Sequence, residues 1–245
     1  MRRRTLTELA NNPDLISGVY NYCDRWCERC PLTSRCLVFA TEAEDDQPST
    51  NQDAANAAFW KQLDTVLQET LALIPEWATT AGVDLTCLEE QGSRRRKRNQ
   101  VDNHPLVLAG KKYAHAASDW FRQFDEGVEQ KERNNPRELI QRYQYQISVK
   151  TIRALAGQTE ESNDYTETSE SPKDSDGSAK VALIGIDRSI AGWRLMQVVI
   201  RDNQASIIPL ILQLAQLRNR IDSQFPEARQ YIRPGFDEVP APPNA

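Results

Sequence analysis

The most apolar stretch of the chain reads AKVALIGIDRSIAGWRLMQVVI over residues 179–200. Its apolar side chains would lie on nearly all sides of a helix, which is typical of a helix at the centre of a domain. Asp187, Arg188 and Arg194 interrupt the run, so it lacks the composition of a membrane span. Ser178 stands before it as the expected N-cap. These residues predict a buried central helix.

Three other segments show apolar residues with helical spacing. They cover residues 105–130, 135–156 and 206–225, and Gly157 is the expected stop of the second. No convincing run of alternating apolar and polar residues indicates a strand. We therefore predict an all-α fold, an antiparallel bundle of about four core helices, with an N-terminal cysteine-rich helix–loop element packed on its side or end.

Composition shifts predict the division of the chain. Residues 159–177 contain seven acidic residues and almost no apolar ones, so this segment should be disordered. A further helix is expected over 54–74, ending or kinking at Pro75. The predicted parts are a cysteine-rich element (1–40), a linker (41–53), a first helical part (54–157), a disordered acidic linker (158–177), a second helical part (178–225) and a flexible tail (226–245).

The bulk composition limits the function classes. The chain has 245 residues, of which 39% are hydrophobic and 27% charged, as in an ordinary globular protein. A net charge of −5 argues against a general nucleic-acid binder, because such binding depends on a basic surface. The first residues, MRRRTLTELANNP, have no apolar stretch of a secretory signal. We expect a cytoplasmic protein that does not enter the membrane.

The cysteines carry the chemistry. Four of the five cysteines lie in the run YCDRWCERCPLTSRC, at Cys23, Cys27, Cys30 and Cys36. We expect a helix over residues 14–29, which would place the first three thiols on one face. Pro31 should end that helix, and the short loop after it would return the fourth thiol to the same point. The spacing predicts that all four thiols converge on one centre.

Three interpretations of these thiols remain open. A 4Fe–4S cluster takes one thiolate per iron from a compact loop, which suits this spacing best. A structural zinc site uses the same ligands but usually draws two close pairs from separate positions. Disulfides are the third interpretation, and cytosolic conditions disfavour them. Cys87 has no partner motif and is expected to be a small core residue.

Part of the run resembles a known cluster loop. The residues CERCPLTSRC, Cys27 to Cys36, are similar to the 4Fe–4S loop of the helix-hairpin-helix DNA glycosylases of the endonuclease III and adenine glycosylase type. The Pro31-Leu32 pair also occurs there. The resemblance implies that Cys27, Cys30 and Cys36 are three ligands and Cys23 the fourth. It covers about fourteen residues, Cys23 lies closer to the next cysteine than in the glycosylases, and the catalytic residues of that family have no counterpart, so no glycosylase activity is implied.

Two charged groups complete the candidate sites. Asp187 and Arg188 interrupt the most apolar helix and predict a buried polar network, with Arg142, Lys150 and Arg153 as partners for the aspartate. A solvated loop over 82–103 carries a run of cations that could contact phosphates. That run consists of Arg94, Arg95, Arg96, Lys97 and Arg98.

No catalytic residues can be named from the sequence, because it contains no phosphate-binding loop, Ser-His-Asp arrangement or paired-carboxylate pattern. The predicted function is therefore that of a 4Fe–4S protein with a structural or electron-transfer accessory role and a redox or protein partner. The sequence favours such a role over that of a self-contained enzyme, because no motif supports a third interpretation, an enzyme that uses the bundle interior around Asp187. The alternative is a structural zinc protein that acts as a nucleic-acid or protein interaction module.

Overall fold

The structure is a computed structural model that describes residues 6–44, 57–82, 98–124, 135–161, 173–200 and 204–237. Its helices are α1 (Leu6–Ala10), α2 (Leu37–Glu44), α3 (Ala57–Ala81), α5 (Pro105–Phe124), α6 (Pro136–Glu161), α7 (Asp174–Val199) and α8 (Gln204–Gln224). Three 3-10 turns lie between α1 and α2, namely η1 (Val19–Asn21), η2 (Cys27–Arg29) and η3 (Thr33–Arg35). The described residues contain no strand, and the predicted all-α fold is confirmed.

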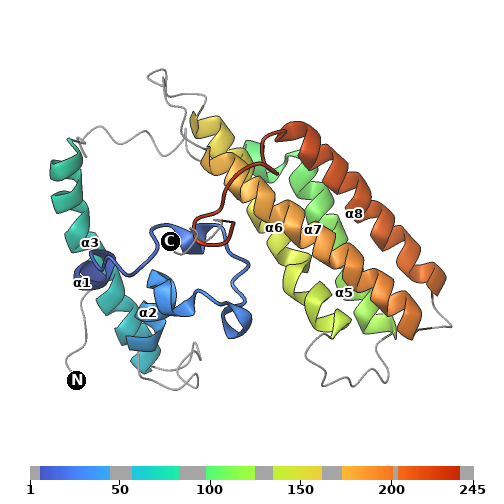
Figure 1. The fold of residues 1–245 in the computed structure, drawn as a ribbon, viewed down its shortest axis with the longest axis horizontal. Coiled ribbons are helices and arrows are strands. Elements are labelled where there is room, and N and C mark those ends of the chain that lie inside the picture. The colour runs from blue at the N-terminus through green and yellow to red at the C-terminus, as the bar shows by residue number, and fades with distance from the viewer. Residues whose placement is uncertain are drawn as a thin grey trace, which may run out of the picture.

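Helices α5, α6, α7 and α8 form a bundle (Figure 1). Helix α6 packs against α5 and α7, and α8 closes the bundle by packing against α7 and α5. Gly185 of α7 lies against Ile147 of α6, and Gly192 lies against Ile140. The residue numbers rise along one helix as they fall along the other, so this central pair is antiparallel.

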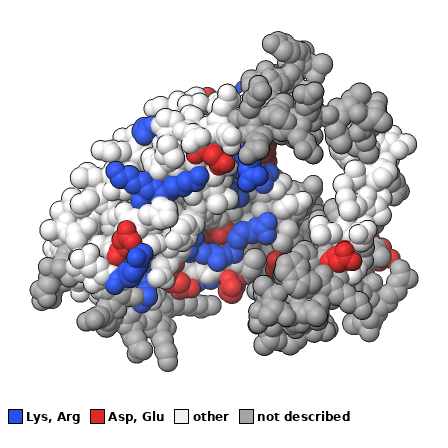
Figure 2. Space-filling view, turned by 180° about the vertical axis from the view of Figure 1, so that it is seen from behind, with Lys and Arg blue, Asp and Glu red and all other residues white. Residues whose placement is uncertain are grey.

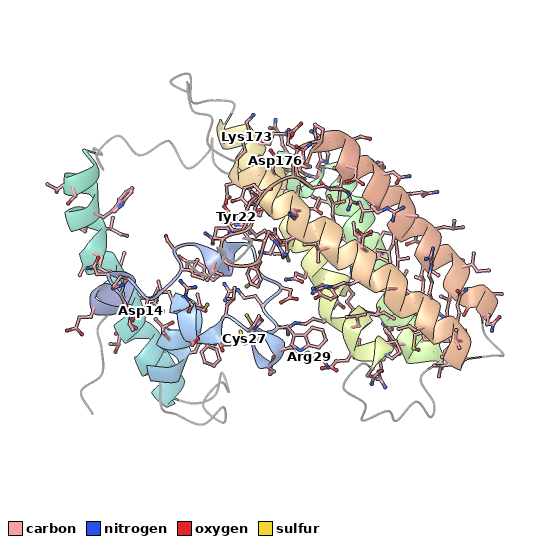
Figure 3. All side chains as sticks on the ribbon, viewed as in Figure 1. Asp14, Tyr22, Cys27, Arg29, Lys173 and Asp176 are labelled. Carbon is pink, nitrogen blue, oxygen red and sulfur yellow. The ribbon has the colours of Figure 1, made fainter. Side chains whose placement is uncertain are left out.

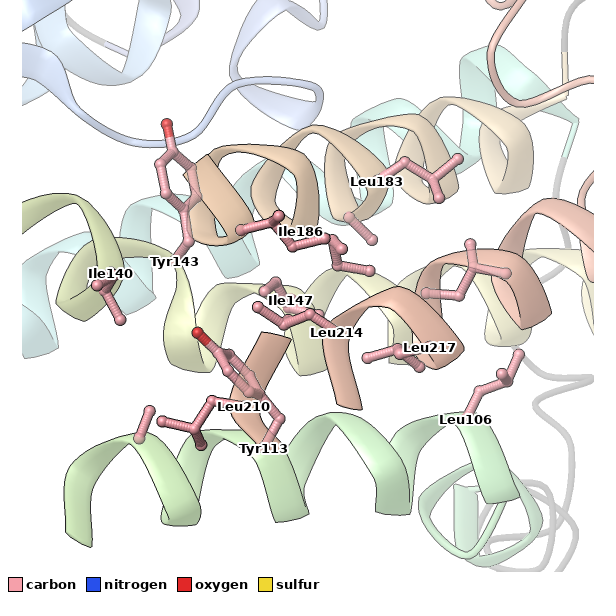
Figure 4. Close-up of a cluster of buried hydrophobic side chains, with 14 of the residues drawn as sticks. Leu106, Tyr113, Ile140, Tyr143, Ile147, Leu183, Ile186, Leu210, Leu214 and Leu217 are labelled. Carbon is pink, nitrogen blue, oxygen red and sulfur yellow. The ribbon is translucent and has the colours of Figure 1, made fainter. Parts of the chain in front are cut away.

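Large apolar side chains from all four helices fill the bundle core (Figure 4). Trp193 of α7 is fully buried, and its indole N–H donates to Tyr113 Oη of α5 at 2.9 Å. The Trp193 ring also packs on Phe121 and Trp120, at centroid distances of 5.4 and 5.0 Å. Other buried residues of this core are Ile140, Tyr143, Ile147, Leu183, Ile186, Leu214 and Leu217.

Two helix boundaries predicted inside the bundle are wrong. Gly157 does not end α6, which continues to Glu161. Ser178 is not a cap, because α7 begins at Asp174 and Ser178 is fully buried within it. A Cβ at Gly157 would stand 3.5 Å from the backbone of Ser175 of α7, an ordinary van der Waals distance. Gly157 and Ser178 both lie inside helices, although their sequence pattern is that of helix ends.

The outer helices also extend beyond their predicted bounds. Helix α3 begins at Ala57 and passes through Pro75 to Ala81, whereas the sequence predicts an end or a kink at the proline. The hydroxyl of Thr79 donates to the Pro75 carbonyl at 2.8 Å within this continued helix. Helix α2 includes residues 41–44, which belong to the predicted linker.

The predicted loops are shorter than expected. Residues 158–161 belong to α6 and 174–177 to α7, so the acidic linker predicted over 158–177 is wrong at both ends. Residues 98–102 of the predicted loop 82–103 are helical. The remaining parts, residues 162–172 and 83–97, lie outside the described residues.

The C-terminal segment contradicts the prediction of a flexible tail over 226–245. The red-brown stretch after α8 in Figure 1 crosses back to the blue cysteine-rich element. Ala228 is fully buried in this stretch, and the ring of Tyr231 lies 5.0 Å from the ring of Tyr22. Residues 226–237 are therefore part of the fold, and residues 238–245 lie outside the described residues.

The cysteine-rich element packs on the side of the bundle, as predicted, while α3 lies on its far side (Figure 1). Contacts from α6 and α7, detailed below, hold the element in place. Among the described helices, none combines the length and the apolar character that crossing a bilayer requires.

Candidate metal centre

The backbone between α1 and α2, residues 11–36, is called the cysteine loop here. The helix predicted over residues 14–29 is wrong, because this stretch consists of turns and the short η1 and η2 segments. Gly18 and Arg25 adopt left-handed backbone conformations, with φ of 70° and 56°. The carboxylate of Asp24 accepts the N–H of Trp26 at 3.1 Å, which closes an Asx-type turn instead of a helical turn.

Each cysteine lies at or near one of the two ends of a 3-10 turn. Cys23 follows shortly after η1, and Cys27 is the first residue of η2. Cys30 and Cys36 follow η2 and η3 with extended backbone, at ψ of 123° and 120°. All four thiols are free of disulfide bonds. The turns reverse the chain repeatedly, which returns the thiols to one region without a regular helix.

All four cysteines line one pocket. Figure 3 shows Cys27 in the part of the loop that faces the bundle, with Arg29 and Tyr22 on either side along it. Trp26 is buried and belongs to the bundle core, whereas the cysteines are half-buried. The other apolar and aromatic residues of the lining are Val19, Tyr20, Leu32, Val38, Phe39 and Phe236.

The thiols share the pocket without forming a coordination sphere for one ion. Across the part of the chain that the structure describes, no three His, Cys, Asp or Glu side chains are placed to hold a single metal ion. A zinc site requires its thiolates to meet about 2.3 Å from one point. A 4Fe–4S cluster takes one thiolate on each of four irons. Four thiols around one pocket are the donor types and the donor number that such a cluster uses.

The surroundings of Cys27 favour the protonated form of its thiol. Burial raises the pKa of the Cys27 thiol above its usual range, and Glu42 and the other three cysteines raise it further. The thiol of Cys23 donates to the Tyr20 carbonyl at 3.4 Å, and the N–H of Leu32 donates to Cys30 Sγ at the same distance. A metal centre would replace this mutual repulsion with attraction, because coordinated thiols are deprotonated.

Asp24 connects the cysteine loop to the bundle. Its carboxylate accepts the hydroxyl of Tyr143 at 2.7 Å and pairs with Arg188 at 2.7 Å, and Arg188 also donates to the Tyr143 hydroxyl. Burial raises the pKa of Asp24, but the bonds from Tyr143 and from the Trp26 N–H and the charge of Arg188 together hold it below its usual range. This network fixes the backbone directly after Cys23.

Basic residues of α6 hold the backbone directly before Cys23. The ammonium of Lys150 donates to the Asn21 carbonyl at 2.6 Å, and Arg153 donates to the Asn21 side chain at 3.1 Å. Burial lowers the pKa of Lys150, and Cys23 is close enough for its charge to oppose that shift. A cation therefore stands beside one of the four thiols.

Farther along the loop, Arg29 makes two contacts of its own. It pairs with Glu138 of α6 at 2.7 Å and lies over the Trp26 ring, with its guanidinium carbon 3.9 Å from the centroid. The Arg29 and Glu138 side chains are 33% and 49% exposed, so water screens this pair. The part of the loop that follows Trp26, called its outer half here, is thus held more weakly than the part around Cys23.

The predicted partners of Asp187 are wrong. Asp187 pairs with Arg218 and Arg229, each at 3.3 Å, and its side chain is 39% exposed. Arg188 is 48% exposed and joins the cysteine loop, as described above. The two residues therefore belong to two separate, half-exposed networks and not to one buried network, because successive helix positions point in different directions.

The structure does not place the predicted phosphate-contacting run. Arg94, Arg95, Arg96 and Lys97 lie outside the described residues, as does Cys87. Arg98 is 86% exposed at its side chain and stands 3.9 Å from Asp102. Figure 2 shows Lys and Arg gathered across the middle of one face, with Asp and Glu beside them. Positive and negative charges are therefore mixed on this face.

The sequence reasoning missed Phe236, which reaches the cysteine pocket from the far end of the chain. The signal was present in the run Arg233-Pro234-Gly235-Phe236, because a Pro-Gly pair followed by an aromatic residue is typical of an ordered turn. It also missed Tyr143 as a partner of Asp24, because spacing along the chain does not report a contact between residues so far apart in sequence. Comparisons with protein-family models, with curated proteins and with solved structures find no match to this chain.

Proposed function

We propose that this protein binds a 4Fe–4S cluster through Cys23, Cys27, Cys30 and Cys36, and that the cluster has a structural or electron-transfer role. The observation that carries the proposal is that four free thiols from one short loop line a single pocket. The local resemblance of Cys27–Cys36 to the cluster loop of the DNA glycosylases agrees with it. A cluster of this type supplies one-electron transfer and cross-links its four ligands.

Residues around the pocket are suited to that centre. Lys150 stands beside Cys23 and offsets the negative charge that deprotonated thiols bring. The N–H of Leu32 already points at the Cys30 sulfur, and hydrogen bonds of this kind tune reduction potentials. Trp26 and Phe39 belong to the apolar lining of the pocket, and an apolar lining limits the access of water.

The loop supplies a physical reason for a structural role. Its 3-10 turns satisfy few backbone groups compared with a helix, and its outer half is held to the bundle by an exposed ion pair. Metal–thiolate bonds at Cys27, Cys30 and Cys36 would fix this half directly. The half-buried cysteines also lie near the surface, where an electron-transfer partner can approach.

The test begins with anaerobic purification, followed by an absorption spectrum and measurement of iron, sulfide and zinc per chain. We expect a broad band near about 400 nm and roughly four irons per chain, as a 4Fe–4S cluster requires. About one zinc and no iron in the anaerobic preparation would overturn the proposal in favour of a structural zinc site.

Substitution of single cysteines identifies the ligands. Cys23→Ser, Cys27→Ser, Cys30→Ser and Cys36→Ser should each reduce the iron content sharply. Cys87→Ser is the matched control, because it removes the one cysteine outside the run, and it should retain the iron of the wild type. Equal iron in all five variants would contradict the assignment. A reversible reduction of the cluster without loss of iron would support electron transfer over a purely structural role.

A further inference from the structure

Residues 231–237, called the C-terminal turn here, have a defined geometry. The N–H of Phe236 donates to the Arg233 carbonyl at 3.1 Å, and Gly235 between them has φ of 72°. With Pro234 before this glycine, the arrangement is that of a type II β-turn, in which proline and glycine occupy their favoured positions. The segment is therefore built to hold one shape.

Charged contacts fasten the C-terminal turn to itself and to α7. The carboxylate of Asp237 accepts two bonds from the Arg233 guanidinium, at 2.8 and 3.0 Å. The ammonium of Lys180 on α7 pairs with the same carboxylate at 2.8 Å and donates to the Tyr231 carbonyl at 2.6 Å. The side chains of Lys180 and Asp237 are only 18% and 23% exposed, so this pair is stronger than a surface ion pair.

The fastened turn lies directly on the cysteine loop. A Cβ on Gly235 would stand 2.6 Å from the side chain of Ile16 and 3.1 Å from that of Leu32, so the glycine backbone is in close contact with the loop. At the other end of the turn, Tyr231 packs on Tyr22. Phe236, the residue after Gly235, lines the pocket of the four thiols.

We propose that the C-terminal turn is a lid on the thiol pocket, with Phe236 as the residue that shields the thiols and Lys180 as its latch on α7. Phe236 is the one lining residue that comes from outside the N-terminal element, among the residues that the structure describes. The solvent exposure of the four thiols therefore depends on residues from the other end of the chain. Its effect on a cluster rests on the function proposed above, whereas its effect on the thiols themselves does not.

The lid acts by keeping solvent and oxidants away from the thiols. An apolar shell around a metal–thiolate centre controls the access of water and shifts its reduction potential. Thiols that are shielded also react more slowly with disulfide reagents, because such exchange depends on access. Removing the ring of Phe236 or the latch of Lys180 should therefore speed attack on the centre.

The experiment uses the full-length chain with Cys87→Ser, so that only the four pocket thiols report. The reduced, chelator-treated protein is mixed with an aromatic disulfide reagent and the release of its chromophore is followed. Phe236→Ala and Lys180→Met should react several-fold faster than the parent, and Phe236→Leu should restore most of the protection. Ile232→Ala is the matched control, because Ile232 belongs to the same segment and its side chain is 62% exposed.

A second readout follows the loss of the band near about 400 nm in air, which reports a 4Fe–4S cluster directly. The same two variants should lose it several-fold faster, while the Ile232→Ala protein decays like the parent. Circular dichroism confirms that every variant remains helical.

The outcomes separate the two proposals. A parent protein without iron, but with thiol rates that follow the lid variants, would overturn the cluster and keep the lid. An iron-loaded parent whose thiol and decay rates are unchanged by Phe236→Ala and Lys180→Met would overturn the lid and keep the cluster. Equal acceleration in Ile232→Ala would also overturn the lid, because it would show general loosening of the segment.

Discussion

Gly177, in the first turn of α7, is the point at which the cysteine loop and the C-terminal turn both meet the bundle. A Cβ on Gly177 would stand 2.4 Å from a ring carbon of Tyr22 and 2.7 Å from a ring carbon of Tyr231. Carbon atoms do not approach this closely, so Gly177→Ala must displace at least one ring. Tyr22 is 8% exposed and donates to Asp174, so it cannot move without losing a contact.

The size of the effect can be worked from these contacts. Overpacking a well-packed site costs about 1–3 kcal/mol of unfolding free energy. We expect the upper part of that range, because the added methyl group overlaps two rings at once. Replacing glycine by alanine in a helix returns about 0.5–1 kcal/mol. If Tyr22 instead moves away, it loses a hydrogen bond to a charged group, which is worth about 1.5–3 kcal/mol. Both routes give a net loss of about 2 kcal/mol in the free energy of unfolding.

Gly157→Ala provides the matched control. A Cβ at Gly157 would meet Ser175 at 3.5 Å, an ordinary van der Waals distance, so alanine fits there without displacement. We expect this variant to be more stable than the wild type by about 0.5–1 kcal/mol, from helix propensity and reduced freedom of the unfolded chain. The two variants carry the same chemical change and should shift stability in opposite directions.

Urea unfolding followed by far-ultraviolet circular dichroism measures both variants. The reasoning is refuted if Gly177→Ala is as stable as the wild type or more stable, because the two rings would then accommodate the added methyl group. It is also refuted if both variants lose the same stability, because the loss would then come from the alanine and not from the crowding.

The remaining predictions concern the contacts that hold the loop and the lid. Tyr143→Phe should cost about 1–2 kcal/mol of unfolding free energy, since it removes the hydroxyl that bonds Asp24 and Arg188. Tyr145→Phe on the exposed side of the same helix should cost clearly less, because it loses only an exposed hydrogen bond with Ser118. Equal losses in urea titrations would show that the Tyr143 hydroxyl does not hold the loop. Bonds from Arg233 and Lys180 keep the pKa of Asp237 well below its usual range, so its stabilisation is complete above the unfolded value of about 4 and is lost as the pH falls through the folded value. Between about pH 5 and pH 2 the wild type should therefore lose more unfolding free energy than Asp237→Asn, and parallel curves would contradict this.

The periodic apolar residues of the bundle could be predicted, because their spacing reports directly which face of a helix is buried. Helices α5 to α8 appear where that spacing is strong, and Tyr113, Tyr143 and Trp193 are buried as it indicates. The helix ends were less predictable. Gly157 and Ser178 resemble a stop and a cap, but both lie inside longer helices, where Ser178 is fully buried.

The cysteine loop and its lid show where sequence reasoning fails. The i, i+4, i+7 spacing of Cys23, Cys27 and Cys30 fits a helix, but the Asx-type turn at Asp24 and the left-handed Arg25 break it. Both are local backbone choices that periodicity does not report. Phe236 reaches the pocket through the C-terminal turn, which Lys180 binds from a distant part of the chain.

Helix α6 has one face that packs in the bundle and another that holds the cysteine loop. Its apolar residues face the bundle, while Glu138, Gln146, Lys150 and Arg153, which recur near the helical period, contact the cysteine loop. Lys150 and Arg153 hold Asn21 before Cys23. Tyr143 of the same helix holds Asp24 after it. The outer cysteines depend on an exposed ion pair and on the lid. The bundle thus fixes one thiol firmly, and a metal centre would complete the positions of the other three.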